Sequence, residues 1–172
     1  SVLLDALVAY DDVADAPALL CVVTGKGPQK AMYLERIRAL ALTRVAIRTV
    51  WLEPGDYPVL LGCADLGVCL HTSTSGLDLP MKVLDMLGCG LPVCAVGFAA
   101  LPELLRHGDN GLVFATADEL AAQLASLLAP VAHDCFPGSQ AVQELSMIGV
   151  VSPYFPAWHG SQEVAPESVL SI

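Results

Sequence analysis

The amino-acid sequence predicts an α/β fold in which helices cover both faces of a parallel β-sheet. Short and almost wholly apolar runs, typical of strands buried on both faces, recur along the chain. Segments with a helical spacing of apolar residues separate these runs. Because crossovers between parallel strands are right-handed, we expect a Rossmann-like sheet of five strands.

The expected elements follow one another with short turns between them. The expected strands are Leu19 to Val23, Val45 to Val50, Leu66 to Leu70, Pro92 to Val96 and Gly111 to Phe114. The expected helices cover residues 2 to 10, about Gln29 to Leu42, Asp56 to Cys63, about Pro80 to Gly88, about Leu101 to His107 and Asp118 to Ala129.

Composition favours one folded unit and excludes one class of partner. Of the 172 residues, 55% are hydrophobic, which is ample for a core. The 18 acidic residues outnumber the 8 basic ones, so the net charge of -10 gives no basic surface for nucleic acid. Any phosphate site must therefore be local, built from backbone N–H groups and one or two lysines.

Cysteine usage and hydropathy give three further expectations. The 6 cysteines form no CxxC pair, so we expect free thiols and a reducing compartment. The 4 histidines are scattered without ligand spacing, so we expect no metal. No apolar stretch approaches the roughly 18 residues of a membrane span, and we expect no transmembrane segment and a soluble chain.

The most informative stretch is the strand, loop, helix and strand unit over residues 66 to 96. A polar loop from His71 to Asp78 leads into the helix, where Pro80 suits the first turn. Gly88 and Gly90 suit its end. A helix that begins after such a loop offers unpaired N–H groups and a positive dipole end, so the unit predicts an anion site.

Lys82 and Asp85 lie three residues apart and so share one face of this helix. Lys82 can neutralise a diphosphate, and Asp85 can accept hydrogen bonds from sugar hydroxyls. The alternative is an ordinary ion pair on a helix surface, worth about 0.2 to 0.5 kcal/mol.

The residues from Leu79 to Asp85, LPMKVLD, and from Gly90 to Val93, GLPV, resemble the donor-nucleotide signature of GT-B glycosyltransferases. That signature is usually P-x-K-x-x-E followed by A-x-G-x-P-V, and Asp85 stands at the position of its Glu. The strings WLEPGDYPVLLGCADLGVCLHTS, SGLDLPMKVLDMLGCGLPVCAV and HGDNGLVF extend the resemblance. It runs from about Ser1 to about Ala129 and implies the C-terminal, donor-binding half of a GT-B fold.

The resemblance implies a donor site around the loop and the helix. Lys82 and the N–H groups near Leu79 would hold the diphosphate, and Asp85 would hold the ribose. Ser75, Gly76 and Asp78 would border the sugar, although Asp78 also suits a helix N-cap. Gly25 and Lys26 would lie beside the nucleotide, although their Gly-Lys-Gly-Pro sequence also suits a plain tight turn.

Two further features, the turn at Trp51 and the residue Glu103, have two interpretations each. In the family, the turn at Trp51 and Leu52 lies near the base, which suggests main-chain base recognition; the alternative places Trp51 in the core. Glu103 resembles an acidic family residue, and we expect it to charge a helix N-terminus more readily than to contact sugar.

The implied activity is that of a β-1,4-mannosyltransferase of N-glycan precursor synthesis. The implied donor is GDP-mannose, the acceptor is dolichol-diphosphate-linked chitobiose, and transfer inverts the anomeric carbon without a metal. The implied location is the cytosolic face of the endoplasmic reticulum membrane, with other transferases of the pathway as partners. The catalytic base would come from an N-terminal domain that this sequence lacks, so the chain alone is expected to be almost inactive.

The ends of the sequence depart from the family. A complete donor domain begins with a further strand, so we expect an unpaired sheet edge here. We divide the chain into a partial donor domain, residues 1–129, and an atypical, weakly ordered tail, residues 130–172, in which residues 141–148 suit a short helix.

Two other functions stay open. The first is a non-catalytic fragment or splice product that retains only nucleotide binding. The second is a nucleotide-binding fold of another superfamily, against which the absence of GxGxxG and GxxxxGK[ST] motifs counts.

Overall fold

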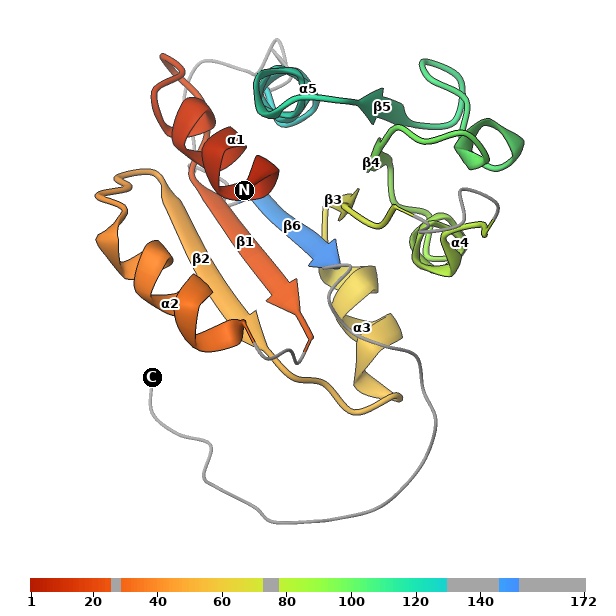
Figure 1. Ribbon diagram of the computed structural model, residues 1–172, viewed down its shortest axis with the longest axis horizontal. Coiled ribbons are helices and arrows are strands. Elements are labelled where there is room, and N and C mark those ends of the chain that lie inside the picture. Colours follow the sequence, from red (N-terminus) through yellow and green to blue (C-terminus); the bar gives the residue numbers. More distant parts are fainter. Residues whose placement is uncertain (26–28, 73–77, 130–145, 152–172) are drawn as a thin grey trace, which may run out of the picture.

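A six-stranded, wholly parallel sheet forms the centre of the molecule (Figure 1). The computed structural model describes residues 1–25, 29–72, 78–129 and 146–151. The strands are β1 (Leu19–Thr24), β2 (Val45–Val50), β3 (Leu66–Cys69), β4 (Val93–Val96), β5 (Leu112–Phe114) and β6 (Ser146–Val151). Their order across the sheet is β2-β1-β6-β3-β4-β5, which confirms the predicted α/β class.

Helices cover both faces of this sheet, as predicted. They are α1 (Val2–Asp11), α2 (Lys30–Ala39), α3 (Asp56–Cys63), α4 (Met81–Gly88) and α5 (Ala117–Leu127), with one 3-10 turn, η1 (Leu101–Glu103). On one face α1 packs against α5, and both bury apolar side chains against the sheet. The helix α2 covers the same face with the partly buried Tyr33 and Ile37. The other face carries α3 and α4, whose Leu61 and Met86 pack with Leu101 and Leu105.

The strand β6 is the main correction to the sequence-based expectation. We expected five strands and a short helix over residues 141–148, but residues 146–151 form a strand in the middle of the sheet. It pairs with β1 on one side and with β3 on the other. In this structure the inner edges of β1 and β3 are therefore paired. Strand pairing between distant segments is decided by tertiary packing, which local sequence patterns do not reveal.

The predicted helix over residues 101–107 is also wrong in length, because only the 3-10 turn forms. Asn110 explains the early end. Its side-chain oxygen accepts the Arg106 N–H at 2.7 Å, and its amide group donates to the Leu104 carbonyl at 3.0 Å. The side chain of Asn110 thus takes backbone groups that a longer helix would have used.

At the edge of the sheet opposite β5, Asp11 fixes the start of the edge strand β2. Its carboxylate accepts hydrogen bonds from the N–H groups of Arg44 at 2.7 Å and Val45 at 3.0 Å, and from both the N–H and the hydroxyl of Thr43. The C-terminal end of α1 and the N-terminal end of β2 are thereby joined.

Candidate functional site

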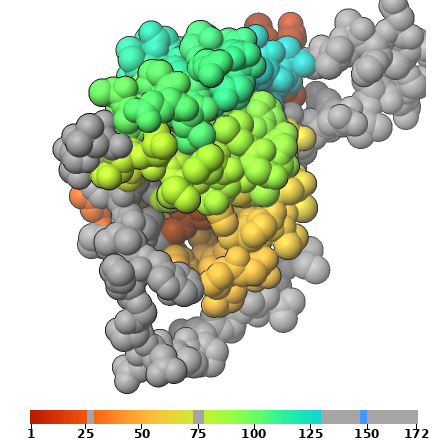
Figure 2. Space-filling model, turned by 90° about the vertical axis from the view of Figure 1, so that its right-hand side faces the viewer, coloured from red at the N-terminus to blue at the C-terminus, as the bar shows by residue number. Residues whose placement is uncertain are grey.

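The candidate site lies where the helices change from one face of the sheet to the other. The helices α1 and α2 cover one face and α3 and α4 the other, and the change occurs at the carboxyl ends of β1, β6 and β3. Open parallel sheets bind ligands at such a switch point. In Figure 2 the yellow-green surface of α4 lies directly above the gold surface of α3.

The helix α4 opens at this edge. Pro80 is buried and occupies the N-cap position with φ -76° and ψ 96°, one residue before the first turn in which we expected it. No side chain of the described residues caps the helix, and the Val83 N–H donates a hydrogen bond to the Pro80 carbonyl at 2.8 Å. Asp78 is exposed and lies two residues before the N-cap position.

The end of α4 follows the predicted glycine pattern. Gly90 has φ +77°, and its N–H donates to the Leu87 carbonyl while the Leu91 N–H donates to the Met86 carbonyl. This pair of bonds is a Schellman motif, in which glycine accepts the left-handed conformation without strain. The helix therefore stops at Gly88 and the chain returns directly into β4.

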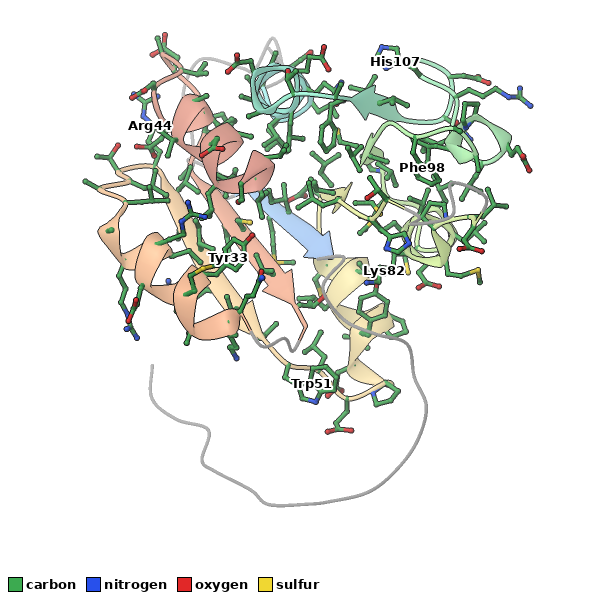
Figure 3. The ribbon with its side chains drawn as sticks, viewed as in Figure 1. Tyr33, Arg44, Trp51, Lys82, Phe98 and His107 are labelled. Atoms are coloured by element: carbon green, nitrogen blue, oxygen red, sulfur yellow. The ribbon has the colours of Figure 1, made fainter. Side chains whose placement is uncertain are left out.

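Lys82 lies in the first turn of α4 and is half-buried. Burial lowers the pKa of its ammonium group, while Cys69 and Asp85 act in the opposite direction. Burial also lowers the pKa of His71, with Lys82 adding to that effect and Asp78 opposing it. These effects show that side chains from the end of β3, from the loop and from α4 lie within one electrostatic environment. In Figure 3, Lys82 is drawn between α4 and α3.

Asp85 is exposed and follows Lys82 by about one turn of α4. Burial raises the pKa of the Tyr57 hydroxyl in α3, and the charges of Asp85 and Cys69 raise it further. That hydroxyl is buried and has no hydrogen-bond partner among the described residues. The surface formed by Lys82, Asp85 and Tyr57 thus combines a cation, a carboxylate and an unsatisfied hydroxyl.

Sequence reasoning missed Tyr57, His71 and Cys69 as parts of this site. Cys69 is a buried residue of β3, and its pKa is raised by burial against the effects of the His71 N–H and of Lys82. For Tyr57 and Cys69 the apolar surroundings in the sequence gave no functional signal. His71 ends an apolar run and begins a polar loop, which is a usable signal for a residue at a sheet edge.

Other predicted residues lie at the same edge of the sheet. Gly25 follows β1 with φ +141°, a conformation that favours glycine, and its N–H donates to the Val50 carbonyl at 3.1 Å. Trp51, which follows β2, is 52% exposed, so its placement in the core is wrong. Figure 3 draws Trp51 beyond the arrowhead of β2. Leu79 is 38% exposed just before α4.

Three candidate residues, Lys26, Ser75 and Gly76, lie outside the described residues. Glu103 is exposed in the 3-10 turn, where it is the acidic residue of the first turn. Among the described residues, no group of three or more His, Cys, Asp or Glu side chains is arranged to hold a metal. In the same part of the chain, no helix is long and apolar enough to cross a bilayer.

Among the described residues, the five cysteines at 21, 63, 69, 89 and 94 are free thiols, as predicted. Cys21, Cys69 and Cys94 are buried, and Cys63 and Cys89 are exposed. The buried ones behave as small apolar residues.

A parallel sheet with helices on both faces, which carries a cation and a carboxylate at its switch point, defines an α/β domain of the Rossmann type. The chain belongs to the glycosyl transferases group 1, whose family model matches residues 1–130. It is 59% identical over 131 residues to chitobiosyldiphosphodolichol beta-mannosyltransferase of Mus musculus, which covers 74% of this chain and 27% of the relative. The human protein of the same name is 55% identical over 131 residues, covering 74% of this chain and 28% of the relative.

A plant relative extends this set. The UDP-glycosyltransferase TURAN of Arabidopsis thaliana is 59% identical over 119 residues, covering 69% of this chain and 26% of the relative. The chain thus spans about a quarter of the length of these relatives. No solved structure matches it. The chain is a glycosyltransferase domain similar to the beta-mannosyltransferases, and the predicted family is confirmed.

Proposed function

We propose that the chain is the donor-binding module of a mannosyltransferase, which binds GDP-mannose through its diphosphate and ribose. The half-buried Lys82 in the first turn of α4 is the observation that carries this proposal. Burial of an ammonium group costs free energy, and a bound diphosphate offsets that cost with opposite charge. The acceptor that fits the name of the mouse relative is a chitobiosyl lipid diphosphate.

Each residue has a defined task in this proposal. Lys82 and the first N–H groups of α4 would bind the diphosphate, on which negative charge grows as the sugar leaves. Asp85 would accept hydrogen bonds from ribose hydroxyls, and Gly25 would let the backbone approach the nucleotide. Asp78 and Leu79, with Lys26, Ser75 and Gly76 from outside the described residues, would border the phosphates and the sugar.

We infer that the chain binds the donor without completing transfer, because it spans only about a quarter of the beta-mannosyltransferases. A further domain would supply the base that activates the acceptor hydroxyl. The work of that whole protein would take place at the cytosolic face of the endoplasmic reticulum membrane, beside other transferases of the pathway. The competing proposal is a non-catalytic fragment or splice product, which retains only nucleotide binding and takes part in no transfer. It rests on the same share of the relatives' length.

Isothermal titration of the full chain with GDP tests the proposal. Asp85→Ala should weaken GDP binding about tenfold to a hundredfold, since a hydrogen bond to a charged group contributes about 1.5 to 3 kcal/mol. Lys82→Ala should weaken it comparably. Asp118→Ala and Arg38→Ala remove exposed charges from α5 and α2 and should leave affinity unchanged.

The choice of ligand separates the alternatives. UDP belongs in the same titration because the name of the plant relative specifies a UDP-glycosyltransferase. Equal affinity for NAD and GDP would show that the site does not select a guanosine diphosphate, and would contradict the proposed donor. Transfer of radiolabelled mannose to lipid-linked chitobiose by the chain alone would contradict the inferred inactivity.

A further inference from the structure

The strand β6 lies outside the part of the chain that matches the family model, although it completes the sheet. The family model matches residues 1–130, which contain the other five strands, and β6 begins at residue 146. It nevertheless occupies the central position, between β1 and β3 (Figure 1). A segment outside the family match thus joins two parts of the sheet that lie inside it.

The backbone of β6 is paired on both sides. All six of its residues are in register with β1, where Cys21 faces Ile148, and four are in register with β3, where Leu66 faces Ile148. Without β6, β1 and β3 would both present unpaired N–H and C=O groups in the middle of the sheet. Unpaired edges of this kind bind extended peptide segments.

Asp65 marks the start of this pairing. Its N–H donates to the Met147 carbonyl at 2.8 Å, and its carboxylate accepts the Met147 N–H at 2.7 Å. Asp65 lies one residue before β3 and is exposed. These two bonds fix where an incoming strand begins and hence its register.

The side chains of the two following residues meet different surroundings. Ile148 is fully buried in the core cluster that contains α1 and α5. Gly149 faces α3, where an added Cβ would lie 3.6 Å from Leu61 Cδ2 and 3.9 Å from Ala64 Cβ. Those are ordinary contacts, so alanine fits at this position. A longer side chain meets Leu61, which is itself only 1% exposed.

We propose that the gap between β1 and β3 is a strand-binding site, which in this chain is filled by its own residues 146–151. The site accepts a parallel, extended, apolar segment with a large aliphatic residue at the position of Ile148 and a small one at the position of Gly149. The two hydrogen bonds of Asp65 set its register. This site is separate from the nucleotide site, and its occupation can be measured without a nucleotide.

The test uses the full chain and a labelled peptide of residues 144 to 152. Ile148→Asp places a charge in the buried position and should expel the chain's own strand. The variant should bind the peptide at least about tenfold more tightly than the wild-type chain does, because the wild-type site is already filled. A peptide with leucine in place of Gly149 is the matched control and should not bind. Equal binding of both peptides to the variant would overturn the proposal.

Hydrogen exchange provides a second measurement, made on the unmodified chain first and then on two variants. Amides of residues 147–151 should be protected together with those of β1 and β3. Gly149→Ala should keep this protection, and Gly149→Leu should lose it in β6. Exchange of residues 147–151 at the rate of a free peptide, while β1 and β3 remain protected, would also overturn the proposal.

Discussion

At the scale of single residues, the site depends on side chains whose burial is costly. The ammonium group of Lys82 and the hydroxyl of Tyr57 both lose water at the boundary between α3 and α4. Buried polar groups of this kind need a partner, and the hydroxyl of Tyr57 has none among the described residues. A ligand that binds at Lys82 and Asp85 would stabilise the folded chain, because it binds the native state and not the unfolded one.

Gly67 of β3 gives a prediction about packing beside this site. A Cβ at this position would lie 2.6 Å from Met86 Sδ and 3.0 Å from Met86 Cγ, and Met86 is fully buried. Gly67→Ala should therefore destabilise the chain by about 1 to 3 kcal/mol, the usual cost of overpacking a core. Urea denaturation monitored by circular dichroism measures this cost.

Gly62 of α3 is the control for that substitution. An added Cβ there meets nothing within 4 Å, and the position is exposed. Gly62→Ala should stabilise the helix by about 0.5 to 1 kcal/mol. Equal stability of the Gly67→Ala chain and the wild-type chain would show that Met86 moves aside at little cost.

The shared helix face of Lys82 and Asp85 could be predicted from their spacing, and their role in a site was implied by the resemblance to GT-B glycosyltransferases. Tyr57 could not be found in that way. Its relation to Asp85 joins two helices through tertiary packing, and the residue types around Tyr57 are those of an ordinary apolar helix. Whether Lys82 and Asp85 bind a nucleotide stays a prediction, which the titration with GDP tests.

At the scale of elements, Asp11 links α1 to β2 and gives the chain a pH dependence. Burial alone would raise the pKa of its carboxyl group, but hydrogen bonds from Thr43, Arg44 and Val45 together lower it from 3.8. A lowered native pKa means that the carboxylate stabilises the fold at neutral pH. This contribution is lost as the pH falls below about 3.8 toward the native pKa.

Asp11→Asn should therefore lower the free energy of unfolding by about 1 kcal/mol at pH 7. This is less than the usual contribution of hydrogen bonds to a charged group, because the site is partly solvated. The difference from the wild-type chain should shrink as the pH falls through that range. Asp12→Asn changes the net charge equally at an exposed neighbour and should have little effect. A difference that stays constant down to the lowest pH would contradict the role of the carboxylate. Urea midpoints at several pH values measure all three chains.

Elements with a strong local pattern were predictable, and elements decided by distant partners were not. The strand over Val45–Val50 and the helix over Asp56–Cys63 have the predicted bounds, because a short apolar run and a Pro-Gly-Asp entry are local signals. The helix expected over residues 101–107 failed because of one side chain, Asn110. The strand β6 was missed because its apolar sequence suits a strand only when β1 and β3 are beside it.

At the scale of the whole molecule, the net charge opposes the proposed ligand while the local site attracts it. The formal charge of -10 repels a nucleoside diphosphate at a distance, and the positive end of α4 with Lys82 acts only over a short range. Added salt screens this long-range repulsion more strongly than it screens the short-range attraction at Lys82. The Debye length falls from about 30 Å at about 0.01 M to about 8 Å at about 0.15 M ionic strength.

The association rate constant of GDP should therefore rise between those two ionic strengths, by roughly twofold or more, because long-range repulsion is screened before the short contacts are weakened. Stopped-flow measurements with a fluorescent GDP analogue give this rate constant directly. Fluorescent guanosine, which carries no phosphate, is the control, and its rate constant should not change with salt. A rate constant for GDP that falls with salt would mean that a broad positive field surrounds the site, in conflict with a cation held only at the start of α4.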